Sequence, residues 1–227
     1  MSRHVTRMFC AVAAGFALTA SGLATAGAAG AAGPSLSGRT AQPAIICCSL
    51  SGVAAASAGN AWAVGSDGGL RSVILHWNGR VWTRTPSPCL GHAYSTLAGV
   101  AAASARSAWA VGLTGGSTLI LHRNGTTWKR VPSPSSPSGG ILAGVAAISA
   151  NSAWAVGATD SGNTLILHWN GTTWEQERSP NPSPGHGEYL VGVAATSARN
   201  AWAVGYAGGG QQALIAHWNG ASWSTMT

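Results

Sequence analysis

Charged side chains are scarce in this 227-residue chain, at 7% of residues, against about 25% in typical soluble domains. Five residues are acidic, and glycosidases usually need a positioned pair of carboxylates, so that chemistry has few candidates. Phenylalanine is limited to Phe9 and Phe16 near the start of the chain and tyrosine to three residues, so the 11 tryptophans are the main bulky aromatic residues. We therefore expect a core built on tryptophan and small aliphatic residues.

One stretch occurs four times and contains every tryptophan. Its clearest copy covers 142–150, 153–157 and 165–171 and ends at Trp174. The first tryptophans of successive copies are Trp62, Trp109, Trp154 and Trp202, at steps of 47, 45 and 48 residues, and the last are Trp82, Trp128, Trp174 and Trp223. A period of about 40–50 residues is typical of propellers and of some helical solenoids.

The contents of each copy favour strands. The third copy has short apolar runs at 142–148, 153–157, 164–169 and 173–180, and none is long enough for a helix of about 10–12 residues. Asn170-Gly171 indicates a two-residue hairpin of type I′, and Asn-Gly recurs at 78, 124 and 219. Four antiparallel strands in each repeat correspond to one propeller blade.

The second strand of each blade has one flat face. Ala153, Ala155 and Gly157 point to one side of the third blade, and Trp154 and Val156 point to the other. Neither face is charged, so we expect blades to stack with the tryptophan of one against the alanine face of the next. The fold class predicted is all-β, a β-propeller with blades at about 50–88, 97–134, 142–180 and 190–227.

Closure of the propeller is a separate question. Four copies are visible, which predicts a compact four-bladed ring. If four blades cannot close alone, an exposed blade face would pair two chains into a dimer with more blades. The oligomeric state is therefore expected to be a monomer or a blade-pairing dimer.

The repeats resemble the Trp-Ala-Val-Gly, His-Trp-Asn-Gly and Trp units of secreted bacterial β-propeller proteins, over about residues 50–227. They resemble more distantly the Asp-box repeats of sialidase-like and photosystem-assembly-factor propellers. Asn170 stands where an Asp box has its aspartate, and His168 stands near the position of its Ser or Thr. The cysteine pair that joins the first two strands in similar proteins is replaced by alanines, as at Ala147 and Ala153.

Residues 1–33 are predicted to be a secretory signal, with Arg3 and Arg7 before an apolar run and small residues at the cleavage site. An uncleaved membrane anchor is the alternative, because the run is nearly long enough to span. Residues 34–49 form a Pro/Ser/Gly-rich lead. We expect a secreted protein, associated with the cell wall or free, without a transmembrane span after cleavage. A disulfide is predicted between Cys89 and one of Cys47 and Cys48, and we select Cys48.

No cofactor, metal site or nucleic-acid partner is expected. The repeated histidines, at 76, 122, 168 and 217, would lie on different blades and are assigned to packing or hydrogen bonding near the Asn-Gly turns. The basic residues behind the net charge of +7 are scattered, which argues against nucleic acid and is compatible with weak attraction to anionic polymers. Asp67 and Asp160 form the best available catalytic pair, which keeps a polysaccharide hydrolase or lyase as an alternative.

The turns shared by all copies are explained by folding, whereas loops that vary on one rim are where recognition is usually carried. We therefore predict a non-enzymatic propeller that binds a glycan, peptide or protein at the rim of the variable loops. A structural module that assembles with other chains is a further alternative. The candidate ligand contacts are Asp67, Arg71, Tyr94, Asp160, His186, Glu188, Tyr206 and Gln211.

Overall fold

The computed structural model describes residues 48–68, 71–88, 94–134 and 139–226, which form four antiparallel four-stranded sheets. Blade 1 comprises β1 (Cys48–Ser57), β2 (Asn60–Asp67), β3 (Ser72–Trp77) and β4 (Trp82–Thr85). Blade 2 comprises β5 (Ser95–Ala102), β6 (Ser107–Thr114), β7 (Ser117–Asn124) and β8 (Thr127–Arg130). Blade 3 comprises β9 (Gly140–Ser149), β10 (Ser152–Thr159), β11 (Thr164–Trp169) and β12 (Trp174–Glu177). Blade 4 comprises β13 (Tyr189–Ser197), β14 (Asn200–Ala207), β15 (Gln212–Trp218) and β16 (Trp223–Thr225), with a short 3-10 turn, η1 (Gly208–Gly210).

The predicted strands are confirmed in kind, and each sheet keeps its four strands in chain order. We call these strands A to D in each blade. Strand D is shorter than expected, because β12 ends at Glu177 and the chain then leaves the sheet. The described residues form four-stranded blades of a propeller, and the all-β prediction is correct.

The Asn-Gly turns differ from the prediction. In blades 1, 3 and 4 the last paired residues of strands C and D are two tryptophans, as with Trp169 and Trp174, so the loop has four residues. Asn170 caps this loop, because its Oδ1 accepts hydrogen bonds from the N–H groups of Thr172 and Thr173 at 2.9 and 3.0 Å. Asparagine is therefore required for its side chain, while Gly171 supplies the positive φ of 100°.

The blades stack through two kinds of face, as the alternation predicts. The Trp face carries the first tryptophan of the repeat with a valine and an isoleucine, and the Ala face is the opposite side of the same sheet. Trp62, Trp109 and Trp154 are at most 1% exposed, because each packs against the Ala face of the following blade. Three such interfaces form the core of the molecule.

A column of glycines brings the A strands of successive blades together. The contacts between blades include β1 with β5, β5 with β9, and β9 with β13. A Cβ on Gly99 would lie 2.8 Å from the backbone oxygen of Ala143, and a Cβ on Gly144 would lie 3.1 Å from Cα of Gly192. Glycine at this position therefore sets the close spacing of the A strands.

A second glycine is required inside each blade. The pairing of strand A with strand B shifts in register at the residue just before the glycine of this column. At that point the backbone of strand A faces the glycine that ends the Trp-Ala-Val-Gly motif of strand B. A Cβ on Gly157 would lie 1.9 Å from the carbonyl oxygen of Ile141. Gly65, Gly112 and Gly205 meet the same obstruction at 1.9, 2.0 and 1.9 Å. The irregularity in strand A, a β-bulge, and the glycine of strand B that it faces therefore occur together in every blade.

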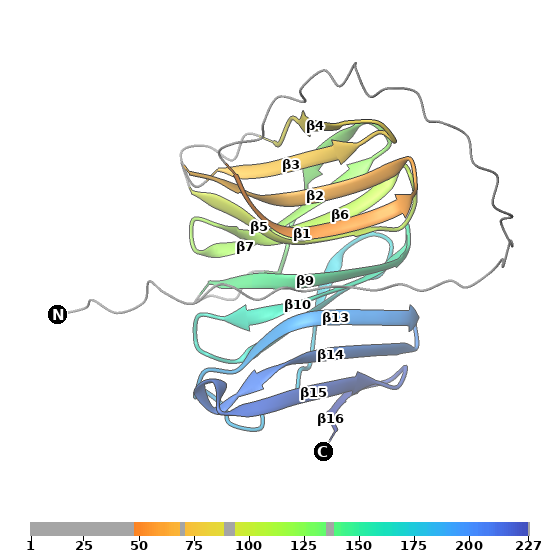
Figure 1. Cartoon of the computed structure of the whole chain (residues 1–227). Coiled ribbons are helices and arrows are strands. Elements are labelled where there is room, and N and C mark those ends of the chain that lie inside the picture. Colours follow the sequence, from red (N-terminus) through yellow and green to blue (C-terminus); the bar gives the residue numbers. More distant parts are fainter. Residues whose placement is uncertain (1–47, 69–70, 89–93, 135–138, 227) are drawn as a thin grey trace, which may run out of the picture.

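The expectation of a compact four-bladed ring is wrong. Figure 1 shows blade 1 at one end of the stack and blade 4 at the other, with blades 2 and 3 between them. Trp202, on the Trp face of blade 4, is 40% exposed, whereas its counterparts in the other three blades are buried. The described blades therefore form an open array, with blades 1 and 4 at its two ends.

The Gly157→Ala variant should lose stability because its new methyl group would overlap the backbone of strand A. We expect a decrease of about 2 kcal/mol or more in the free energy of unfolding, a fall in Tm of roughly 4–8 °C. Gly59→Ala is the matched control, because no atom lies within 4 Å of its added Cβ. Equal melting temperatures for the two variants would contradict the account of the bulge.

Candidate functional site

The rim formed by the A–B and C–D turns is stabilised by hydrogen bonds within each blade, and the same bond recurs from blade to blade. The indole Nε1 of Trp77, Trp169 and Trp218 donates to a carbonyl oxygen of the A–B turn at 3.0–3.1 Å. Blade 2 has Arg123 at this position, and its guanidinium donates to the carbonyl oxygen of Thr126 at 2.9 Å. These four side chains therefore stabilise the turns of this rim.

The opposite rim holds the variable B–C loops and the connections between blades. A hydroxyl pair recurs there between the start of strand C and the serine that follows strand D. The oxygens lie 2.9 Å apart for Ser72 and Ser87, 2.8 Å for Thr118 and Ser133, and 2.8 Å for Thr164 and Ser179. The Pro-Ser segments of the sequence are thus attached to the blade that they leave. We call these contacts the hydroxyl clamps.

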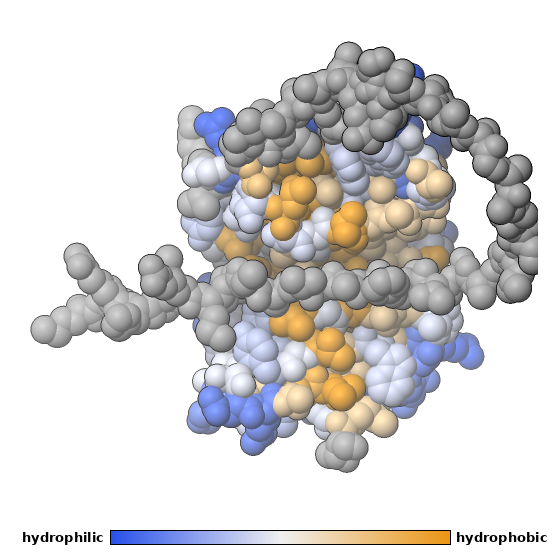
Figure 2. Space-filling model, in the orientation of Figure 1, coloured by the Kyte–Doolittle hydropathy of each residue, from blue (hydrophilic) through white to orange (hydrophobic). Residues whose placement is uncertain are grey.

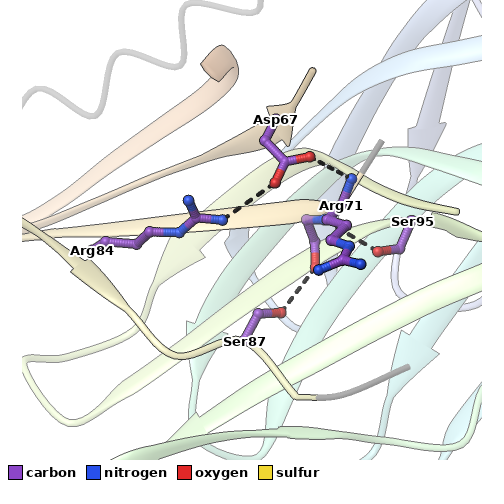
Figure 3. A network of polar contacts seen from close by, with 6 residues as sticks. Asp67, Arg71, Arg84, Ser87 and Ser95 are labelled. Atoms are coloured by element: carbon purple, nitrogen blue, oxygen red, sulfur yellow. Dashed lines mark hydrogen bonds and ion pairs between the residues drawn. The ribbon is translucent and has the colours of Figure 1, made fainter. Parts of the chain in front are cut away.

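Asp67 and Arg71 lie at this rim on blade 1. The Asp67 carboxylate accepts a hydrogen bond from the backbone N–H of Arg71 at 2.9 Å and forms a salt bridge with Arg84 at 3.5 Å (Figure 3). Beside them, the N–H of Ser72 donates to Ser95 Oγ at 3.1 Å, and the Ser72 hydroxyl lies 2.9 Å from the Ser87 hydroxyl. Asp67 is therefore partly engaged in holding the B–C loop.

The loops between blades 3 and 4 form a connected layer. The Glu188 N–H donates to the carbonyl oxygen of Gly162 at 3.0 Å, and the Gly185 N–H donates to Asn163 Oδ1 at 3.0 Å. Glu188 itself is 1% exposed, and its carboxylate accepts a hydrogen bond from the Ser183 N–H inside the loop. Glu188 therefore shapes this layer from within.

The other predicted contacts are at the surface of the same rim. Asp160, His186 and Gln211 are exposed on the loops of blades 3 and 4, and Tyr94 is exposed ahead of blade 2. Tyr206 stacks on Tyr189 at 5.6 Å, and burial together with Tyr206 raises the pKa of Tyr189 to about 12. The structure thus gathers Asp160, His186 and the Tyr206 pair around blades 3 and 4, and it places Asp67, Arg71 and Tyr94 farther along the array.

A shallow polar depression of about 540 Å³ lies beside this loop layer on blade 3. Its residues are not predicted from the sequence, because their hydroxyl and amide side chains form no recognisable motif. The end of strand B, the B–C loop, strands C and D and the connection after strand D supply its lining, which is Thr159, Ser161, Asn163, Thr164, Gln176, Glu177, Arg178, Ser179 and Asn181. The Pro-Ser-rich connection and the variable loop that meet here are the features of the sequence that could have indicated it.

The four histidines pack against the tryptophans of their own blades. Ring centroids lie 4.2 Å apart for His76 and Trp62, and 4.0–4.2 Å apart for the pairs formed by His122, His168 and His217. His122 also meets Ser107 Oγ at 3.3 Å. Burial lowers the pKa of the His122 and His168 rings below its ordinary value, with Glu177 and Glu175 opposing this shift at His168. These rings are structural.

Other predictions fall partly outside the described residues. Cys48 begins β1, but Cys47 and Cys89 are not described, so the Cys48–Cys89 disulfide stays a prediction. The signal at 1–33 and most of the lead at 34–49 are likewise outside the described ranges. Within those ranges, no group of three or more His, Cys, Asp and Glu side chains could hold a metal ion, and no helix is long and apolar enough to cross a bilayer.

The four-stranded blades and their face-to-face stacking define a protein of the β-propeller class. No family model matches the chain, and no curated protein matches it. Two similar solved structures are "YCF48 bound to D1 peptide", at 14% identity and a TM-score of 0.44, and YCF48 from Cyanidioschyzon merolae, at 19% and 0.49. The matches cover 78% and 79% of this chain, and 68% and 56% of the two YCF48 chains. The likeness is one of fold.

Acidification should destabilise the blades through the half-buried histidines. The unfolded chain binds protons on histidine below about pH 6.5, whereas the folded rings resist protonation. The contribution of these histidines to the free energy of unfolding is therefore complete above about pH 6.5. It decreases as the pH falls toward their lower pKa values in the folded state. Thermal melts should show a smaller decrease in Tm between pH 7 and 5 for His122→Phe than for the unmodified protein. His186→Phe, at an exposed position, is the control, and an unchanged slope in His122→Phe would contradict the assignment.

Proposed function

We propose that this protein is a non-enzymatic binding module whose ligand occupies the variable-loop rim of blades 3 and 4. A glycan is the first candidate, with a peptide or protein as the other ligand classes of the same site. We also propose that the chain acts outside the cell, after removal of the signal at 1–33. The observation that carries the binding proposal is the polar depression on blade 3 beside the exposed side chains of the loop layer.

The chemistry of that surface suits a polyhydroxylated ligand. Hydroxyl and amide groups dominate the depression, and Gln176 and Arg178 are exposed in it. Tyr206, 37% exposed, offers a flat ring at the same rim of blade 4. Ligand sites combine a few positioned polar groups with apolar or aromatic surface, and the loop layer presents both on a scaffold of backbone hydrogen bonds. Recognition without catalysis is the role that this surface supports best.

The acidic residues support the non-catalytic role. Asp67 is paired with Arg84, and the Glu175 carboxylate accepts a hydrogen bond from Asn170 Nδ2 at 2.7 Å. Asp160 lies on blade 3, so blade 2 separates it from Asp67. A glycosidase of the usual kind needs two carboxyl groups within about 5–10 Å of each other. Structural contacts thus engage two of the acids that would have to serve in catalysis.

The proposal predicts that removing exposed rim side chains weakens binding without unfolding the protein. A ligand is first identified by applying the purified protein to an array of glycans and peptides. The double variant Asp160→Ala/Gln211→Ala should then raise the Kd about tenfold or more, a loss of about 1.4 kcal/mol, while Tm changes by less than about 2 °C. Isothermal titration calorimetry measures Kd, and thermal melts measure Tm.

The matched control is Thr126→Ala, an exposed position on the opposite rim. Its Kd should equal that of the unmodified protein. Loss of binding in Thr126→Ala with retention in Asp160→Ala/Gln211→Ala would place the ligand on the other rim. Cleavage of the bound glycan, detected as new reducing ends and abolished by Asp160→Asn, would instead establish the hydrolase alternative.

A further inference from the structure

The charged residues are divided unequally between the two halves of the array. Residues 139–226, which form blades 3 and 4, contain two basic and four acidic residues, a formal charge of −2. Residues 48–134, which form blades 1 and 2, contain seven basic residues against Asp67 alone, a formal charge of +6. The seven are Arg71, Arg80, Arg84, Arg106, Arg123, Lys129 and Arg130. This half of the array therefore attracts anions.

The outer edge of blades 1 and 2 carries a row of cations. Strand D is the edge strand of each sheet, β4 in blade 1 and β8 in blade 2. Arg84 pairs with Leu75 in blade 1 as Arg130 pairs with Leu121 in blade 2, so the two arginines occupy the same position of the repeat. Lys129 precedes Arg130, and all three cations are exposed. Neighbouring edges thus present like charges at matching places.

The edge of blade 3 has the opposite sign. Glu175 pairs with His168 as Lys129 pairs with His122, so the acid and the lysine occupy the same position in β12 and β8. The uncharged Gln176 follows, at the position of the edge arginines of blades 1 and 2. The row of cations therefore ends at blade 2.

Two further cations lie in the turns beside this edge. Arg80 is exposed in the C–D turn of blade 1, and Arg106 is exposed in the A–B turn of blade 2. The carbonyl oxygen of Arg106 accepts a hydrogen bond from the Gly125 N–H at 2.8 Å, in the turn that leads into β8. Asn60 Nδ2 of blade 1 donates to the carbonyl oxygen of Ala105 at 3.5 Å, which joins the two blades at this rim. We name this surface the basic edge, and it consists of Arg80, Arg84, Arg106, Lys129 and Arg130.

The basic edge is short of acidic partners. Arg84 forms a salt bridge with Asp67 at 3.5 Å, whereas the other four side chains make no hydrogen bond or ion pair with the described residues. The two remaining cations of this half are placed differently. Arg71 is at the opposite rim, and Arg123 is half-buried and donates to the carbonyl oxygen of Thr126. The fold therefore leaves the charge of the basic edge largely uncompensated.

The surroundings of the basic edge favour a polyhydroxylated partner over nucleic acid or a lipid surface. The exposed hydroxyl groups of Thr83 and Thr127 lie on the same two strands. Trp128 of β8 is 5% exposed, so its ring is not available to stack on bases. The large hydrophobic side chains that are exposed in the described chain lie outside the basic edge, which disfavours insertion into a bilayer. Figure 2 likewise shows hydrophilic surface along both rims, with apolar surface concentrated in the middle of the face drawn.

We propose that the basic edge binds an acidic polysaccharide, whose carboxylate, sulfate or phosphate groups provide the acidic partners that the fold lacks there. A guanidinium group donates two parallel hydrogen bonds to such an anion. An anion repeated along a polymer therefore matches cations repeated on neighbouring blades. This surface belongs to other blades than the loop rim of blades 3 and 4, and binding at one does not depend on a ligand at the other.

Labelled heparin and labelled polygalacturonate test the proposal with sulfate and carboxylate as the anions. Fluorescence anisotropy at about 50 mM NaCl should show binding of at least one of them, and uncharged dextran should not bind. The Kd should rise about tenfold or more between about 50 and 200 mM NaCl, because counterions released from the polymer oppose binding at the higher salt concentration.

The repeat itself provides a matched control for the Arg106→Gln variant. Arg106 and Arg199 occupy the same place in the A–B turns of blades 2 and 4, and the N–H of each donates to a serine Oγ at 3.2 Å. Arg106→Gln should raise the Kd about threefold, whereas Arg199→Gln should leave it unchanged, although both variants remove one positive charge. The triple variant Arg106→Gln/Lys129→Gln/Arg130→Gln should raise the Kd about thirtyfold with an unchanged Tm, because all three side chains are exposed.

The contrary outcomes are distinct. Equal losses of affinity in Arg106→Gln and Arg199→Gln would show that net charge attracts the polymer without a defined surface. Tighter binding of single-stranded DNA or of anionic lipid vesicles than of both polysaccharides would assign the basic edge to one of those partners. Failure of both polysaccharides to bind at about 50 mM NaCl, or equal binding of dextran, would show that acidic sugars are not recognised. Each of these results would overturn the proposal.

Discussion

The structure depends on one contact, repeated three times, in which a tryptophan of strand B is held between a histidine of its own blade and the aromatic side chains of the next. The histidine stacks on the indole from the neighbouring strand, and the D-strand tryptophan of the following blade meets it edge to face, as Trp223 meets Trp154 at 86°. With so few charged residues, these aromatic contacts and the small residues of the Ala face carry the packing between blades. The remaining features of the repeat position this contact.

Blade 2 departs from the pattern, and the departure is compensated. Arg123 replaces the tryptophan found at 77, 169 and 218, and its guanidinium lies 4.5 Å from the centre of the Trp62 ring. A cation over an indole face is attractive, so the first interface keeps a partner for its tryptophan. Arg123 also lowers the pKa of His76, after the larger effect of burial. The first interface therefore places a cation beside Trp62, where the other two place Trp169 and Trp218 beside Trp109 and Trp154.

The sequence predicted the elements better than their arrangement. Alternation of Ala and Trp around 153–157 identified both faces of a blade, because side chains alternate along a strand. Closure could not be predicted, since the rotation between blades depends on backbone spacing that the pattern does not encode. Asn170 was predicted to be a central residue of a two-residue turn, but its side chain caps a four-residue loop. The prediction was wrong because a left-handed backbone and side-chain capping both favour asparagine. The depression on blade 3 was missed because its amides and hydroxyls are ordinary surface residues. Nor did the sequence indicate that Glu188, one of the candidate contacts, is buried, or that the others are divided between two parts of the array.

The linear stacking also determines how stability is shared along the chain. Each blade touches its sequence neighbours, as β5 touches β1 on one side and β9 on the other, so the free energy of folding resembles a sum of blade terms and coupling terms between adjacent blades. In such a system the end blades are coupled once and the middle blades twice. Blades 1 and 4 should therefore open first under denaturing conditions, with hydrogen exchange fastest at the two ends and slowest in β6 and β10, whereas a closed ring would couple every blade equally and make unfolding concerted.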